Sequence, residues 1–147
     1  MFDSDMILID GSVDYNAAND GAPTSVTRDA ATGAVVFDIG TGGTPVSGLV
    51  AVMVIPDDVD GGTDTLTAVL EASDAVAFGS DVHQLGSFDI AAATQGIIVG
   101  TEVPCTAMLR FSTTKRYIRI NGTVGTTPDD FGAVKAYLTP YAFGNVL

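Results

Sequence analysis

The chain has 147 residues, 46% of them hydrophobic and 16% charged, with a formal net charge of −12 at pH 7. This length suits one domain with a real core, and the apolar content excludes a disordered, solvated chain. The excess of acidic over basic residues repels phosphate and anionic headgroups. The longest apolar run is too short to span a bilayer. We therefore expect neither nucleic acid nor a membrane as a partner.

Residues 1–34 are rich in small and polar residues around one apolar cluster, Met6, Ile7, Leu8 and Ile9. Such a composition buries too little surface to hold itself in place. We predict an extended N-terminal arm, held by a neighbouring subunit or by packing back along its own domain, and the sequence leaves both open. The four apolar residues are candidate interface residues. The acidic start also lacks the basic residues of an export signal, so we expect assembly inside a cell.

From residue 35 to residue 147 the apolar pattern has period two, interrupted by Gly, Pro, Asp and Thr clusters. This pattern predicts an all-β domain, a jelly-roll-like β-sandwich preceded by the arm. We expect strands near 35–39, 46–55, 65–72, 82–90, 96–99, 105–111, 116–124 and 132–139.

Alternation along the predicted strands assigns their faces. Four residues of the strand at 105–111 share the inner side: Cys105, Ala107, Leu109 and Phe111. The other side carries Thr106, Met108 and Arg110. The inner residues of two further strands are Leu66, Ala68, Leu70, Val134, Ala136 and Leu138. The segment Val46–Ile55 is apolar on both faces, which indicates either a central strand covered on both sides or an outer face covered by a neighbouring chain. We favour partial coverage by a partner.

Four of the six basic residues lie within ten positions of one another: Arg110, Lys115, Arg116 and Arg119. Alternation turns Tyr117 and Arg119 outward. If neighbouring strands carry Arg110, Lys135 and Tyr137 on the same outer face, an Arg/Tyr patch results, of the kind enriched in interface hot spots. The alternative is that each base simply pairs with one of the many Asp side chains.

Several segments, in order along the chain, resemble the capsid cement or decoration proteins of tailed phages, of the kind found on the Bordetella phage head. They are residues 65–74 with Ala77 and Phe78, Leu85–Phe88, Arg116–Val124 and Phe131–Leu138. The resemblance implies a jelly-roll-like homodimer or homotrimer on the virion surface, assembled in the host cytoplasm. It also implies that the major capsid protein is the partner, and it brings neither catalytic residues nor a cofactor.

The sequence contains few of the residues that enzymatic catalysis usually requires. Nucleophilic catalysis requires a base beside the nucleophile, and the single histidine, His83, lies far along the chain from the single cysteine, Cys105. A hydrolytic zinc site usually needs three ligands with His or Cys among them. We therefore expect no enzyme activity and no bound metal.

The loop Asp57–Asp64 offers four carboxylates in a flexible, glycine-containing segment of the kind calcium accepts. Its spacing is not that of an EF-hand, and Asp-Gly-Gly is also ordinary turn chemistry. An alternative function is therefore a calcium- or carbohydrate-binding β-sandwich module of a fibre or adhesin. The absence of Trp counts against a sugar platform.

Overall fold

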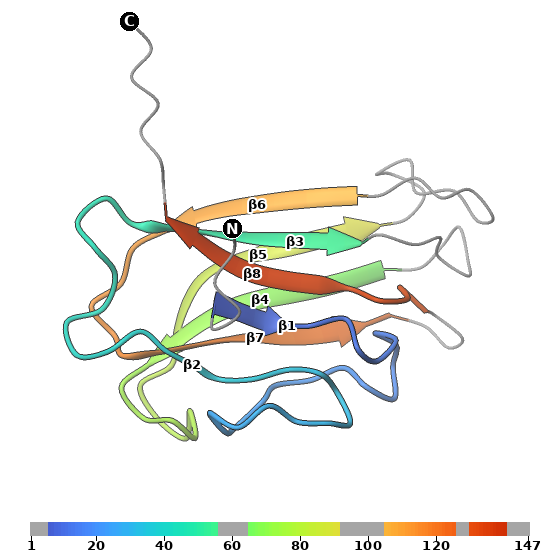
Figure 1. Cartoon of the computed structure of the whole chain (residues 1–147), viewed down its shortest axis with the longest axis horizontal. Helices are drawn as coiled ribbons and strands as arrows, with labels where there is room; N and C mark the ends of the chain where they lie inside the picture. Colours follow the sequence, from blue (N-terminus) through green and yellow to red (C-terminus); the bar gives the residue numbers. More distant parts are fainter. Residues whose placement is uncertain (1–5, 56–64, 92–104, 126–129, 141–147) are drawn as a thin grey trace, which may run out of the picture.

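The computed structural model describes residues 6–55, 65–91, 105–125 and 130–140. In these ranges the chain forms eight strands in two antiparallel four-stranded sheets (Figure 1). The strands are β1 (Ile7–Ile9), β2 (Phe37–Asp38), β3 (Leu49–Ile55), β4 (Thr65–Ser73), β5 (His83–Ala91), β6 (Cys105–Phe111), β7 (Tyr117–Val124) and β8 (Lys135–Pro140). The all-β sandwich prediction is confirmed, whereas its jelly-roll topology stays a prediction.

The strand order is β1-β8-β3-β6 in one sheet and β2-β7-β4-β5 in the other, here called sheet I and sheet II. Strands β6 and β7 are consecutive in the chain, yet they belong to different sheets. The chain also changes sheets between β3 and β4 and again between β7 and β8. Because of these crossings, neighbours in sequence often lie on opposite sides of the core.

The predicted faces are confirmed by burial. Leu66, Ala68 and Leu70 of β4 are fully buried, while Thr65 and Thr67 between them are exposed. Strand β8 alternates in the same way, and the inner side of β6 is half-buried where its outer side is exposed. Burial stops at about half on β6 because it is the edge strand of sheet I.

Strand boundaries differ from the predictions at short and edge elements. The strand expected at 46–55 begins only at Leu49, and the one at 35–39 is reduced to Phe37–Asp38. The strand expected at 96–99 lies outside the described residues. Strand β1 was not predicted, because three apolar residues show no alternation and its partner β8 lies far away in sequence.

Residues 6–34, expected to form an arm, pack back on the sandwich. Leu8 and Ile9 of β1 are 1% exposed and belong to the core. Further along, the Tyr15 amide donates to Gly132 O at 2.8 Å, and Gly21 exchanges two backbone hydrogen bonds with Gly122 of β7. This segment therefore runs from β8 of sheet I to β7 of sheet II. Of the two possibilities left open by the sequence, the structure shows packing along the chain's own domain.

Candidate functional site

The structure divides the predicted Arg/Tyr patch between two sheets. Tyr117 and Arg119 lie on β7, whose neighbours in sheet II are β2 and β4. Arg110, Lys135 and Tyr137 lie on β6 and β8 of sheet I. The condition for a single patch, that these strands be neighbours, is therefore not met. Chain order could not reveal this, because β6 and β7 cross from one sheet to the other.

Arg119 occupies the outer side of β7 as predicted, but it is covered and only 8% exposed. Its Nε donates to Glu71 Oε2 at 2.7 Å, and its Nη1 donates to the carbonyl of Pro23 at 3.2 Å. The guanidinium lies 4.0 Å from the centroid of the Phe78 ring. The Arg119–Glu71 ion pair is therefore buried, and the hydrogen bond to Pro23 links the N-terminal segment to sheet II. Arg119 is not part of a surface exposed to a partner.

The exposed base Arg116 pairs with an aspartate, as expected if the basic residues form ion pairs rather than an Arg/Tyr patch. Its Nη2 donates to Asp38 Oδ2 at 2.8 Å, and its guanidinium lies 5.0 Å from the Tyr117 ring centroid. Hydrogen bonds from Arg116 hold the pKa of the Asp38 carboxyl below its usual value.

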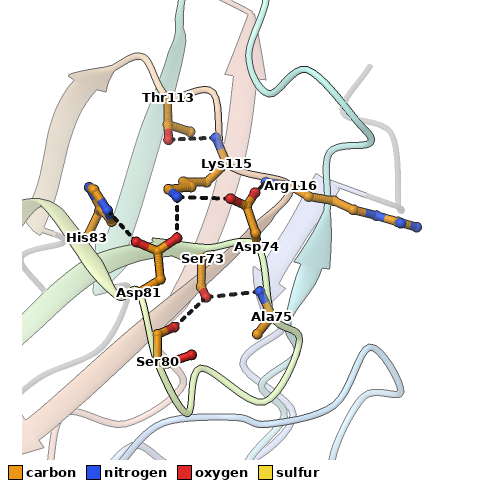
Figure 2. A network of polar contacts seen from close by, with 9 residues as sticks. All are labelled: Ser73, Asp74, Ala75, Ser80, Asp81, His83, Thr113, Lys115 and Arg116. Atoms are coloured by element: carbon orange, nitrogen blue, oxygen red, sulfur yellow. Dashed lines mark hydrogen bonds and ion pairs between the residues drawn. The ribbon is translucent and has the colours of Figure 1, made fainter.

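A polar network gathers at the end of the sandwich where β5 begins (Figure 2). Lys115 Nζ donates to Asp74 Oδ2 at 2.9 Å and also to Asp81 Oδ2. The other oxygen of Asp81 lies 2.9 Å from His83 Nε2. The hydrogen bonds from Lys115 lower the pKa of both carboxyl groups, and the carboxylates raise the pKa of Lys115. The network joins the 74–83 loop to the 112–116 loop.

Beside this network is an open hollow of about 530 Å³ between the 42–46 loop, the start of β5 and the 112–115 loop. Its lining is mostly hydroxyl, amide and glycine, with Pro45, Val46 and Leu85 as apolar members. Lys115, the one lysine in the lining, already faces two carboxylates. His83 also lines the hollow, where its Nε2 lies against Asp81, and in the described residues it makes no hydrogen bond to a hydroxyl of the lining.

His83 and Cys105 lie at opposite ends of the sandwich. Strand β5 begins at His83 and β6 begins at Cys105, and the two strands start at opposite ends (Figure 1). Burial raises the pKa of the Cys105 thiol, which disfavours the reactive thiolate. This geometry gives no His–Cys catalytic dyad.

No cluster of three or more His, Cys, Asp or Glu that could hold a metal ion occurs in the described ranges. The carboxylate loop Asp57–Asp64 lies outside them, so calcium binding there stays open. In the same ranges no helix has the length and apolarity needed to cross a bilayer.

The outer face of sheet I has a composition unlike that of the rest of this acidic chain. The register of β6, β3 and β8 places nine outer residues in three rows: Arg110, Val50 and Thr139; Met108, Val52 and Tyr137; Thr106, Val54 and Lys135. Directly paired residues of antiparallel strands share a face, so the nine form one surface. We call this surface the nine-residue face.

The nine-residue face is apolar along its middle and cationic at two opposite corners. Val52 at its centre is 5% exposed, although it points away from the core, whereas Met108 beside it is 71% exposed. None of the nine residues is acidic. Arg110 also donates to the carbonyl of Ser47 at 3.3 Å, which holds its side chain near the corner.

The outer face of sheet II is hydrophilic by comparison. Its exposed members on β4, β5 and β7 include Thr65, Thr67, Asp89 and Thr123. Water hydrates these side chains well, whereas an exposed methionine beside valines is typical of a surface that meets another protein. The two faces of the sandwich therefore differ in kind, and the sequence indicated this only through the doubly apolar segment Val46–Ile55.

The candidate interface residues near the N-terminus separate into two pairs. Leu8 and Ile9 are part of the chain's own core, so their side chains do not reach a partner. Met6 and Ile7 are half-buried, and Ile7 pairs with Tyr137 at the edge of the nine-residue face.

Neither a comparison with protein-family models nor one with curated proteins gives a match for this chain. The resemblance to capsid cement proteins therefore stays a prediction.

Proposed function

We propose that the chain is a structural component of a phage virion, a capsid cement protein that binds adjacent major capsid protein subunits on the head surface. The observation that carries the proposal is the difference between the two outer faces. Sheet I presents an apolar strip with cationic corners, and sheet II presents hydroxyls and carboxylates.

A cement protein needs a rigid body and surfaces for protein contact, and it needs no reacting groups. The sandwich supplies the rigid body, because β3 is paired along its length with β6 on one side and with β8 on the other. The predominantly acidic surface keeps the protein soluble and well separated from the packaged nucleic acid. Many copies with modest individual contacts then stabilise a shell through avidity.

The test is binding of the purified chain to undecorated heads of the phage that encodes it. We expect saturable binding with a fixed number of copies per head and increased resistance of the heads to heat. The copy number is read by gel densitometry after sedimentation of the heads. Heads that bind no chain at micromolar concentration would contradict the proposal.

The variants for this test follow from the structure. Arg119 is unsuitable as a probe, because its substitution would disturb a buried ion pair. Met108→Lys changes the exposed centre of the nine-residue face, and Thr67→Lys places the same charge on the exposed face of sheet II. We expect Met108→Lys to reduce occupancy of the heads and Thr67→Lys to leave it nearly unchanged.

A further inference from the structure

We propose that Asn121 is a deamidation site that the N-terminal segment, residues 6–34, keeps closed, and that the reaction makes release of this segment permanent. This role is independent of capsid binding. The sequence Asn121-Gly122 is the single Asn-Gly pair of the chain. Asparagine is most reactive before glycine, because glycine has no side chain to hinder its own amide nitrogen or to restrict its backbone.

Deamidation needs no group beyond the chain itself and water. The Gly122 nitrogen attacks Cγ of Asn121 and a new C–N bond closes a succinimide ring, while the Cγ–Nδ2 bond breaks and Nδ2 leaves as ammonia with the proton of the Gly122 amide. Water then opens the ring to aspartate or isoaspartate, and nothing is oxidised or reduced. The reaction therefore requires a Gly122 nitrogen that is free, an Asn121 side chain that can turn toward it, and access of water.

The N-terminal segment occupies the Gly122 nitrogen. The Gly122 amide donates to Gly21 O at 3.2 Å, and the Gly21 amide donates to Gly122 O at 2.9 Å. Two residues further along β7, the Val124 amide donates to Asp20 Oδ2 at 2.9 Å. Strand β2 covers this side of β7 near its start, and the N-terminal segment covers it here. The nucleophile is thus held in a backbone pairing that only displacement of the segment opens.

The Asn121 side chain and water are also kept from the reacting position. Asn121 Nδ2 donates to Glu71 Oε1 at 3.1 Å, which holds the side-chain amide toward β4, whereas the Gly122 nitrogen points toward the N-terminal segment on the opposite side. Gly122 is buried, with the Tyr15 ring against its inner side. Ring closure requires rotation of the Asn121 backbone, and the regular pairing of Asn121 with Val69 on β4 opposes this rotation.

The product of the reaction weakens the contacts that closed the site. Aspartate at position 121 loses the amide donor and places a second carboxylate beside Glu71, whose side chain is 13% exposed. Two carboxylates in a largely buried site repel one another and compete for one guanidinium, that of Arg119. Arg119 also donates to Pro23 O at 3.2 Å, so this competition weakens its bond to the N-terminal segment. Isoaspartate adds a methylene to the backbone and disturbs the register of β7.

Release of the N-terminal segment and deamidation of Asn121 therefore reinforce each other. While the segment is bound, the nitrogen, the side chain and water are kept apart. Each release frees the Gly122 nitrogen, and after the reaction the segment returns to a site with one hydrogen bond fewer and one negative charge more. A reversible displacement is thus recorded as a chemical change that does not reverse.

The first test compares the rate of Asn121 deamidation in the folded full chain and in the same chain in denaturant, both in mildly alkaline buffer. Trypsin releases residues 120–135, in which Asn121 is the single amide side chain, and mass spectrometry measures the converted fraction. We expect the folded chain to react more slowly by about tenfold or more, because the site opens only in a minor state. Equal rates in the two conditions would overturn the proposal.

The second test loosens the N-terminal segment. Gly21 has a φ of 106°, so Gly21→Ala should strain the contact with Gly122 and speed deamidation of the folded chain by roughly fivefold. Gly42→Ala is the matched control, since its φ is 103° and a new Cβ at either position would meet no atom within 4 Å. Equal acceleration by the two variants would assign the opening to global unfolding and refute the role of the segment.

Asp20→Ala is a second variant of the same contact, and it introduces no backbone strain. It removes the carboxylate that accepts from the Val124 amide, so we again expect faster deamidation in the folded chain. Asp29→Ala is its control within the segment, because the Asp29 carboxylate accepts from the Ala31 amide and does not contact β7 through that bond. Rates unchanged in both Gly21→Ala and Asp20→Ala would contradict the proposal.

The third test asks whether the product hinders return of the segment. Arg28 is the one trypsin site before Arg110, and its Nη2 donates to Ile7 O at 2.7 Å, so limited cleavage after Arg28 reports release. We expect cleavage of Asn121→Asp to be faster than that of the wild type by about threefold or more. Thr123→Asp places the same charge at an exposed position of β7 and should behave as wild type. Equal cleavage of the two variants would show that deamidation does not make release permanent.

Discussion

The phenol ring of Tyr15 occupies the space that a Cβ atom on Gly122 would need, with the Tyr15 hydroxyl directly against that position. Gly122 lies on the inner side of β7 and pairs in regular register with Ala68 of β4. Tyr15 is 2% exposed, and burial raises its pKa well above the usual value. The missing side chain in sheet II is thus replaced by a ring from the N-terminal segment.

Substitution Gly122→Ala should lower the free energy of unfolding by about 1–3 kcal/mol, because the methyl group forces Tyr15 out of its position. Chemical denaturation measures the loss. Combining it with Tyr15→Phe, which removes the nearest clashing atom, should recover part of that loss as a coupling energy. The control is Gly79→Ala, where a new Cβ meets no atom within 4 Å. Equal effects at positions 79 and 122 would contradict this account.

Substitution Arg119→Ala should destabilise the protein by about 3–5 kcal/mol, because it leaves Glu71 with an uncompensated charge in a largely buried site. It also removes the hydrogen bond to Pro23, so limited proteolysis should cut the N-terminal segment sooner. Arg116→Ala is the matched control, since its pair with Asp38 is exposed and should contribute little. If both variants unfold at the same denaturant concentration, the burial of Arg119 has no energetic role.

The network around Lys115 should give stability a dependence on acid pH. Asp74 and Asp81 have pKa values below 3.8 in the folded state, so their contribution is present above pH 3.8 and is lost as pH falls through the lowered values. The raised pKa of Lys115 has the opposite sense: its contribution is present below pH 10.5 and is lost as pH rises beyond the raised value.

Lys115→Gln should therefore reduce the loss of stability between about pH 4 and pH 2. The measurement is the unfolding midpoint at each pH, determined by circular dichroism. Lys135→Gln removes the same charge from another surface and should leave the shape of that acid limb unchanged. An acid limb that is identical in wild type and Lys115→Gln would show that the lysine does not hold these carboxylates.

The thiol of Cys105 should react slowly with iodoacetamide at neutral pH, because burial raises its pKa and reduces the thiolate fraction. Mass spectrometry of the intact protein measures the rate, and the same reaction in denaturant supplies the reference. Alkylation of the folded chain as fast as that of the denatured chain would contradict the inner position of this residue.

Periodicity in the sequence was sufficient to predict the class of fold and the inner and outer sides of the long strands. Leu66, Ala68 and Leu70 alternate with threonines, and this local pattern has one favourable solution, in which the apolar side is buried. The same reasoning correctly placed Phe111 inside and Met108 outside. It also identified β3 as apolar on both sides, which indicated the nine-residue face.

The tertiary structure alone decided which strands are neighbours, and therefore which side chains share a surface. Arg110 and Arg119 are close in sequence, but the chain crosses between sheets after β6, so they lie on opposite outer faces. The role of residues 6–34 was also undetermined, because Leu8 and Tyr15 gain their burial from β8 and β7, more than a hundred residues further along. Alternation is a local property set by backbone geometry, whereas strand order depends on contacts between distant segments, which a single sequence does not encode in any local pattern.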